Sequence, residues 1–90
     1  GTVTEEKKLV SANDLVNEVL IVHKKTIREK QALVHLGRLP EILCHPNSII
    51  QVFQNLISNA LKYNEGSHRP EISISFTEKK DSWQFSVSDN

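Results

Sequence analysis

Residues 51–64 read QVFQNLISNALKYN and predict a helix with two distinct faces. At about 100° per residue, one side of this helix carries four polar residues within an arc of about 80°: Gln51, Asn55, Asn59 and Lys62. The other side carries apolar residues: Ile50, Phe53, Leu56, Ile57, Ala60 and Leu61. One face therefore packs into a core. The other presents amides and an ammonium, which suit phosphate oxygens and a hydrated divalent cation.

An ordinary solvated surface helix is the alternative to a binding helix, because such helices also place polar residues opposite an apolar stripe. Lysine and glutamate usually dominate a solvated face. Here the amide residues are Gln51, Gln54, Asn55 and Asn59. Asparagine inside a helix lowers its stability, so another requirement must favour it at two positions. The composition of this face favours binding over simple solvation.

A second candidate site residue follows the last predicted strand. Trp83, Phe85 and Val87 alternate with polar residues, and Asp89 has the parity of this apolar face. A buried, unpaired carboxylate is costly, so an inward Asp89 is a candidate acceptor for a hydrogen bond from a ligand. The alternative is a simple turn, since Asp-Asn after a strand is common turn chemistry. The amide-rich helix upstream strengthens the binding interpretation.

The pattern Asn55-Leu56-x-x-Asn59-Ala60-x-Lys62-Tyr63 resembles the asparagine box of sensor histidine kinases, in the ATP-binding domain of the Bergerat fold. The resemblance implies that Asn59 holds the Mg²⁺ ion that bridges the phosphates of ATP. It also implies that Lys62 contacts phosphate and that Tyr63 lies beside the nucleotide. Asn55 corresponds to another amide, on either the metal side or the phosphate side.

Asp89-Asn90 resembles the opening of the same family's first glycine box, whose aspartate accepts a hydrogen bond from the exocyclic amine of adenine. The resemblance covers nearly the whole chain but only the N-terminal part of the family's domain. Without the lid and the strands that follow, the phosphates would be exposed to water and the hairpin would have an open edge. We expect these 90 residues alone to be inactive, to bind nucleotide weakly or not at all, and to form a homodimer through that edge.

The resemblance implies an enzyme of two-component signal transduction. The parent protein would transfer the γ-phosphoryl group of Mg–ATP to a histidine on a separate dimerisation domain, and the receiver domain of a response regulator would then accept it. None of the four histidines here is followed by the Glu or Asp typical of that acceptor. The phosphoacceptor is therefore expected outside this chain, and no residue within it is assigned as catalytic.

Other members of the superfamily suggest alternatives. Heat-shock chaperones and type II topoisomerases carry a glutamate at the position of Asn55 to activate water, and anti-sigma serine kinases share that glutamate pattern. An amide cannot act as a general base, which favours a kinase over an ATPase. A nonenzymatic, degenerate Bergerat module used for dimerisation or partner binding remains the alternative from another class. Such a module has no need for Asn55, Asn59, Lys62 and Asp89 together.

Composition excludes several other functions. The formal net charge is zero, so no basic patch suggests nucleic acid. Cys44 is the only cysteine, which excludes an internal disulfide and fits a cytoplasmic location, whether or not the parent is anchored in a membrane. No apolar run reaches the length of a membrane span or a signal peptide. Metal-binding Cys or His spacings, a glycine-rich phosphate loop and a nucleophilic serine motif are also missing from the sequence.

The remaining patterns predict one partial histidine-kinase-like ATP-binding domain over residues 1–90, with residues 1–6 a linker or a flexible leader left by excision of a fragment. Strands are predicted at residues 7–11, 32–36, 41–44, 72–76 and 82–88. A helix capped by Ser11 or Asn13 should run to about Lys30. The helix of residues 51–64 should begin near Pro46, with Asn47 or Ser48 available to cap it and Gly66 to end it.

Two further residues are predicted to serve packing. His23 lies near the apolar stripe of the first helix, and Cys44 ends a short strand as a small core residue. The lysines and arginine between residues 24 and 30 are predicted to form a solvated face. Together these patterns predict an α+β fold, a two-layer α/β sandwich of the histidine-kinase ATPase type that is incomplete.

Overall fold

The computed structural model describes residues 6–62, 69–79 and 82–89, with side chains described as far as residue 77. In chain order the elements are β1 (Lys8–Ser11), α1 (Ala12–Val22), α2 (Lys24–Lys30), β2 (Leu33–Leu36), β3 (Glu41–Cys44), α3 (Pro46–Lys62), β4 (Glu71–Lys79) and β5 (Ser82–Asp89). The predicted helix end at Gly66 lies outside the described residues. So do residues 1–5 of the predicted leader.

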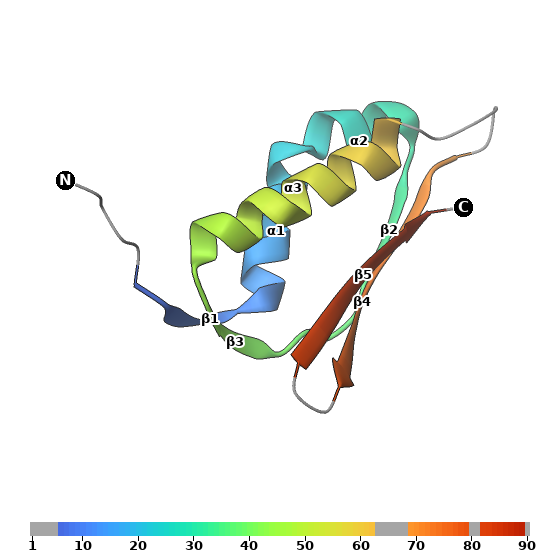
Figure 1. Ribbon diagram of the computed structural model, residues 1–90. Coiled ribbons are helices and arrows are strands. Elements are labelled where there is room, and N and C mark those ends of the chain that lie inside the picture. The colour runs from blue at the N-terminus through green and yellow to red at the C-terminus, as the bar shows by residue number, and fades with distance from the viewer. Residues whose placement is uncertain (1–5, 63–68, 80–81, 90) are drawn as a thin grey trace.

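The described residues form two sheets and a layer of helices. The β1 strand pairs antiparallel with β3, and a second sheet has the order β2-β4-β5. In the second sheet β2 runs parallel to β4, whereas β4 and β5 form the predicted antiparallel hairpin. Figure 1 shows the three helices together on one side of the β2-β4-β5 sheet. This arrangement confirms the predicted α+β class and its two layers.

The first helix begins as predicted but ends earlier. The Ser11 hydroxyl accepts a hydrogen bond from the Asp14 N–H at 3.2 Å, as an N-cap does. The prediction of one helix to Lys30 is wrong, because His23, with φ −95° and ψ 11°, separates α1 from α2. The break leaves Ile21 and Val22 exposed while Ile27 packs against the core. The apolar spacing thus continues across the break, from α1 into α2.

Asn13, the alternative predicted cap of this helix, instead binds the connection between β2 and β3. Its side-chain Nδ2 donates to the Gly37 carbonyl at 3.0 Å, and its Oδ1 accepts from the Leu39 N–H at 2.7 Å. Leu39 itself is buried. A single amide thus fastens the connection between β2 and β3 to the first turn of α1, which satisfies backbone groups that no strand pairs.

The two faces of α3 are mostly those predicted. Its buried residues are Phe53, Ile57, Ala60 and Leu61, spaced as one face of a helix. Leu56, predicted on the packed side, is 38 % exposed, because it lies at the border of that face. Pro46 opens the helix as predicted, but Asn47 and Ser48 lie inside its first turn, which excludes them as caps.

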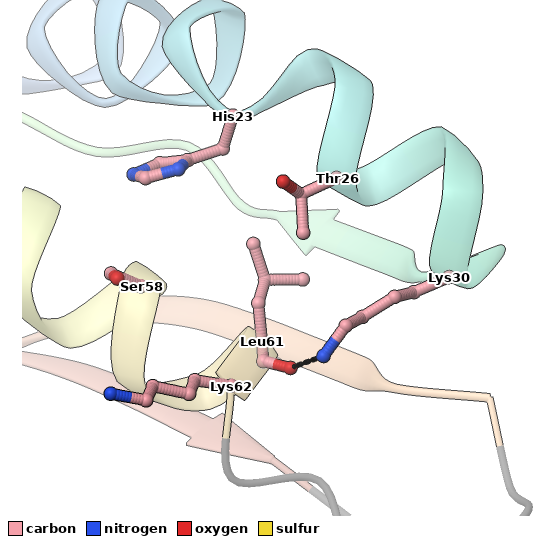
Figure 2. A pocket seen from close by; sticks show the side chains of 6 residues that line it. All are labelled: His23, Thr26, Lys30, Ser58, Leu61 and Lys62. Atoms are coloured by element: carbon pink, nitrogen blue, oxygen red, sulfur yellow. Dashed lines mark hydrogen bonds between the residues drawn. The ribbon is translucent and has the colours of Figure 1, made fainter.

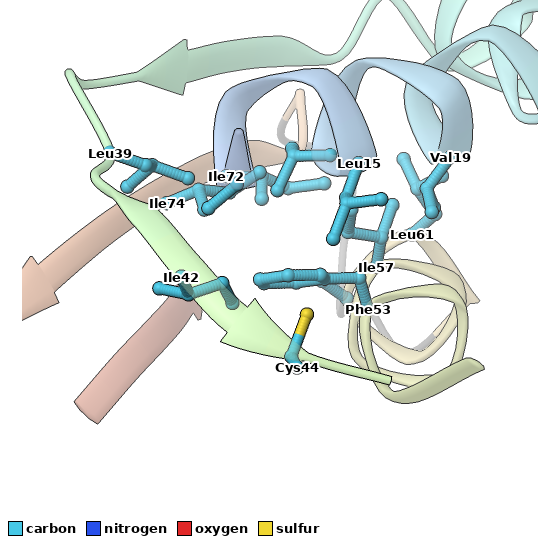
Figure 3. Close-up of a cluster of buried hydrophobic side chains, with 13 residues drawn as sticks. Leu15, Val19, Leu39, Ile42, Cys44, Phe53, Ile57, Leu61, Ile72 and Ile74 are labelled. Carbon is cyan, nitrogen blue, oxygen red and sulfur yellow. The ribbon is translucent and has the colours of Figure 1, made fainter. Parts of the chain in front are cut away.

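One hydrophobic core lies between the helices and the sheets (Figure 3). Its buried members are Ala12, Leu15, Val16, Val19, Leu39, Ile42, Cys44, Phe53, Ile57, Ala60, Leu61, Ile72 and Ile74. Cys44, at the end of β3, is 8 % exposed and belongs to the core, as predicted. Since α1, α3 and β4 all contribute, the core fixes the position of α3 relative to the sheet.

Candidate functional site

The exposed face of α3 is the candidate site. Asn55 and Asn59 are four residues apart and Lys62 follows three residues later, so their side chains are neighbours along one side of the helix. All three are exposed, and so is Gln51 one turn earlier. On the opposite side, Phe53 and Ile57 are almost completely buried. Burial of that apolar face turns the polar face outward.

Asp89 lies on a strand that packs against this helix. It is the last residue of β5 and pairs across the hairpin with Ile72, which is fully buried on β4. The α3 helix contacts β5, and Figure 1 shows the strand running beneath α3 toward the end of the chain. The backbone register thus agrees with the predicted parity, while the direction of the Asp89 carboxylate stays a prediction. Tyr63 lies outside the described residues.

Lys30 makes a contact beside the candidate site that the sequence does not predict. Its ammonium donates a hydrogen bond to the Leu61 carbonyl, in the last turn of α3. The sequence predicts a solvated face for Lys30, whereas this contact joins residues that are 31 positions apart. No local pattern predicts such a partner. The prediction was therefore incomplete, although the Lys30 residue as a whole is exposed.

A cavity of about 230 Å³ lies between α2 and α3 and adjoins the candidate site at Lys62. Its lining residues are His23, Thr26, Lys30, Ser58, Leu61 and Lys62 (Figure 2). None of them is acidic. His23 is half-buried, as predicted, and its Nε2 atom is buried with no hydrogen-bond partner among the described residues. Neither Asn55 nor Asn59 lines this cavity, so it meets the polar face of α3 at Lys62.

A larger cavity of about 380 Å³ lies at the other end of α3. It is bordered by β3 residues and by His45, Ser48 and Ile49 near the helix start. None of the predicted site residues lines it, so its size does not identify it as the binding site.

Among the described residues, the helices are too short or too polar to span a membrane.

The donor groups on α3 fit one class of metal site. Within residues 6–62, 69–79 and 82–89, no group of three or more His, Cys, Asp or Glu residues could hold a metal ion by itself. Mg²⁺ does not require such a cage, because it commonly takes one or two protein oxygens and completes its shell with water and substrate phosphates. The amide oxygens of Asn55 and Asn59 are suitable protein ligands, and Lys62 can neutralise phosphate.

Comparison with known proteins finds a matching family model and similar sequences. The family model described as histidine kinase-, DNA gyrase B-, and HSP90-like ATPase matches residues 44–90, which include every predicted site residue. The chain is 35% identical over 77 residues to the phytochrome-like protein Cph1 of Synechocystis sp. and 36% identical over 67 residues to cyanobacterial phytochrome A of Nostoc sp.. These alignments cover 86% and 74% of the chain but only 10% and 9% of the two relatives. The chain thus spans about a tenth of the length of these relatives.

Solved structures show the same fold at lower sequence identity. The catalytic domain of the histidine kinase ThkA superposes with a TM-score of 0.79 at 21% identity, covering 93% of this chain and 58% of that one. A structure of ThkA in complex with the response regulator protein TrrA gives a TM-score of 0.77 at 20% identity, with coverage of 92% and 25%. The predicted histidine-kinase ATPase type of fold is therefore confirmed.

Proposed function

Because the chain belongs to the family of histidine kinase-, DNA gyrase B- and HSP90-like ATPases, we propose that it is the ATP-binding part of a sensor histidine kinase. The observation that carries the proposal is the exposed row of Asn55, Asn59 and Lys62, held outward by a fully packed opposite face. Two amides and one ammonium on one helix provide oxygen ligands and a positive charge side by side, which is the combination that Mg–ATP needs.

Each residue has a separate task in this proposal. Asn59 supplies an amide oxygen to Mg²⁺, and Asn55 supplies another to the metal or an amide N–H to a phosphate. Lys62 binds a phosphate oxygen as a compact point charge. When bound, the metal ion neutralises charge on the phosphates. Tyr63 would lie beside the nucleotide, and Asp89 would accept a hydrogen bond from the exocyclic amine of adenine.

The proposed reaction is transfer of the γ-phosphoryl group to a histidine on a separate dimerisation domain of the same kinase. The first amide of the row, Asn55, cannot take a proton from water, so hydrolysis should be slow and the phosphoryl group should be kept for a protein acceptor. The receiver domain of a response regulator would then accept it. The structure of ThkA in complex with a response regulator supports the choice of this partner class.

The proposal includes three statements about the chain as it stands. Residues 1–90 form one part of an ATP-binding domain, and alone they bind nucleotide weakly and do not catalyse. Within the described residues the far edge of β5 has no partner strand, which leaves it available to pair with a second copy. The proposed location is cytoplasmic, since a chain with a single cysteine fits a reducing compartment.

Replacing Asn59 by alanine in the complete protein tests the proposal. Asn59→Ala should abolish Mg²⁺-dependent autophosphorylation, measured as incorporation of labelled phosphate from ATP. Asn17→Ala is a matched control, because Asn17 is also an exposed helical asparagine but lies on another helix, α1. The control should retain the wild-type rate. Wild-type autophosphorylation by Asn59→Ala would refute the proposed site.

Calorimetry tests the statement about the isolated chain. The 90 residues should show no binding of Mg–ATP at micromolar concentrations. A monomer of this chain that bound Mg–ATP with micromolar affinity would contradict it. Sedimentation of the same sample would show whether the open edge of β5 brings two copies together.

A further inference from the structure

The last turn of α3 depends on a contact from another helix. The final carbonyls of any α-helix have no partner within the helix and need one from elsewhere. In α3 the Leu61 carbonyl accepts a hydrogen bond from the Lys30 ammonium. Leu61 is 2 % exposed and directly precedes Lys62, the last residue of the helix. The Lys30 contact therefore acts on the peptide next to the proposed phosphate-binding residue.

The α2 helix that carries Lys30 is itself lightly packed. None of its residues is buried, and Ile27 alone among them packs against the core as a partly buried residue. Its backbone is joined to its neighbours by hydrogen bonds from Ile27 N–H to the His23 carbonyl and from Ala32 N–H to the Ile27 carbonyl. The packing of α2 against the core does not account for the hydrogen bond between Lys30 and α3.

The Lys30 side chain bridges a space between α2 and α3. The cavity of about 230 Å³ lies between the two helices, and Figure 2 shows the Lys30 side chain, which lines it, reaching the Leu61 carbonyl. A cation at the C-terminal end of a helix interacts favourably with the helix dipole, which makes an ammonium suited to this position. Lys62 lines the same cavity, and Figure 2 shows the two lysine side chains on opposite sides of the Leu61 carbonyl.

We propose that Lys30 is a positioning residue for nucleotide binding: by holding the Leu61 carbonyl, it sets the orientation of the last turn of α3 and thereby of Lys62. Lys30 does not touch the nucleotide in this arrangement. It acts through α3, so its removal should lower affinity for the phosphates more than affinity for the base. This inference rests on the function proposed above.

Three variants of the complete protein test the inference. Lys30→Met keeps the aliphatic stem but removes the donor and the charge, and Lys30→Arg keeps both. Lys25→Met is the matched control, because the Lys25 side chain lies on the same helix, is 88% exposed and pairs with Glu29 at 3.9 Å. Calorimetry would give the affinity of each variant for Mg–ATP and for adenosine, which lacks phosphates.

Lys30→Met should bind Mg–ATP roughly fivefold more weakly, in the range reported for residues that act on a site through another element. Its affinity for adenosine should change less than twofold. Lys30→Arg should recover most of the loss, whereas Lys25→Met should match the wild type. Equal losses for Mg–ATP and adenosine without recovery in Lys30→Arg would indicate general disruption of the domain and would overturn the inference.

Asn59→Ala, measured alongside, separates the inference from the function on which it rests. If Asn59→Ala weakens Mg–ATP binding but Lys30→Met does not, the site stands and the positioning role of Lys30 falls. If Asn59→Ala leaves Mg–ATP binding intact, the proposed function falls, and the role of Lys30 falls with it.

Discussion

Asn13 offers a test of how the fold holds the connection between β2 and β3. Its side chain makes two hydrogen bonds to this connection, a donation to the Gly37 carbonyl at 3.0 Å and an acceptance from the Leu39 N–H at 2.7 Å. We expect Asn13→Ala to lower the stability of the protein. The loss should come mainly from the Leu39 N–H, which lies in a partly buried contact next to a buried side chain.

The expected loss in the free energy of unfolding is the sum of three contributions. Leaving a partly buried N–H without an acceptor costs about 2 kcal/mol, and the exposed Gly37 carbonyl, which water can reach, adds about 0.5 kcal/mol. Alanine is a better helix former than asparagine by about 0.6 kcal/mol, which offsets part of the loss. The expected net destabilisation is therefore about 2 kcal/mol. For a chain of this size, that corresponds to a lower melting temperature by roughly 10 °C.

Urea unfolding followed by circular dichroism would measure the change. Asn17→Ala is again the matched control, because it makes the same replacement one turn further along α1 at an exposed position. That control should be stabilised by about 0.6 kcal/mol from helix propensity alone. Equal free energies of unfolding for the two variants would refute the role assigned to Asn13.

Three further predictions concern stability and would be checked by thermal or urea unfolding. Gln31 has φ 55°, so Gln31→Gly should stabilise by about 0.5–1 kcal/mol, and an unchanged or lower stability would contradict this. Ile57 is fully buried, so Ile57→Ala should cost about 3 kcal/mol, whereas Val52→Ala at a half-exposed position on the same helix should cost less than about 1 kcal/mol. Ser11→Ala removes an N-cap and should cost about 1 kcal/mol; no loss would show that the cap is dispensable.

The parts of the fold that the sequence predicted are those with a repeating local pattern. The buried residues of α3 recur at helical spacing, and Ile72 and Ile74 alternate on β4, so both elements and their core faces were predictable. The row of Asn55, Asn59 and Lys62 followed from the same spacing. Its exposure is confirmed because the opposite face is fully occupied by the core.

The features that were missed depend on tertiary contacts. His23 divides the first helical region although no glycine or proline marks the site, and the apolar spacing continues through it to Ile27. Asn13 and Lys30 each bind a backbone carbonyl more than twenty positions away, and their own neighbourhoods in the sequence predict a cap and a solvated face. Pairing over such separations is set by packing and has no local signal.

The parallel pairing of β2 with β4 has a consequence for folding. Leu33 aligns with Glu71 and Leu36 with Ile74, so the whole of α3 is synthesised between two strands that must find each other. Closing such a long loop makes this step slow compared with helix formation. Until β4 arrives, Phe53 and Ile57 lack the part of the core that Ile72 and Ile74 supply. Partly synthesised chains that end before Ile72 should therefore expose the apolar face of α3. Chaperones that bind apolar segments should recognise this face.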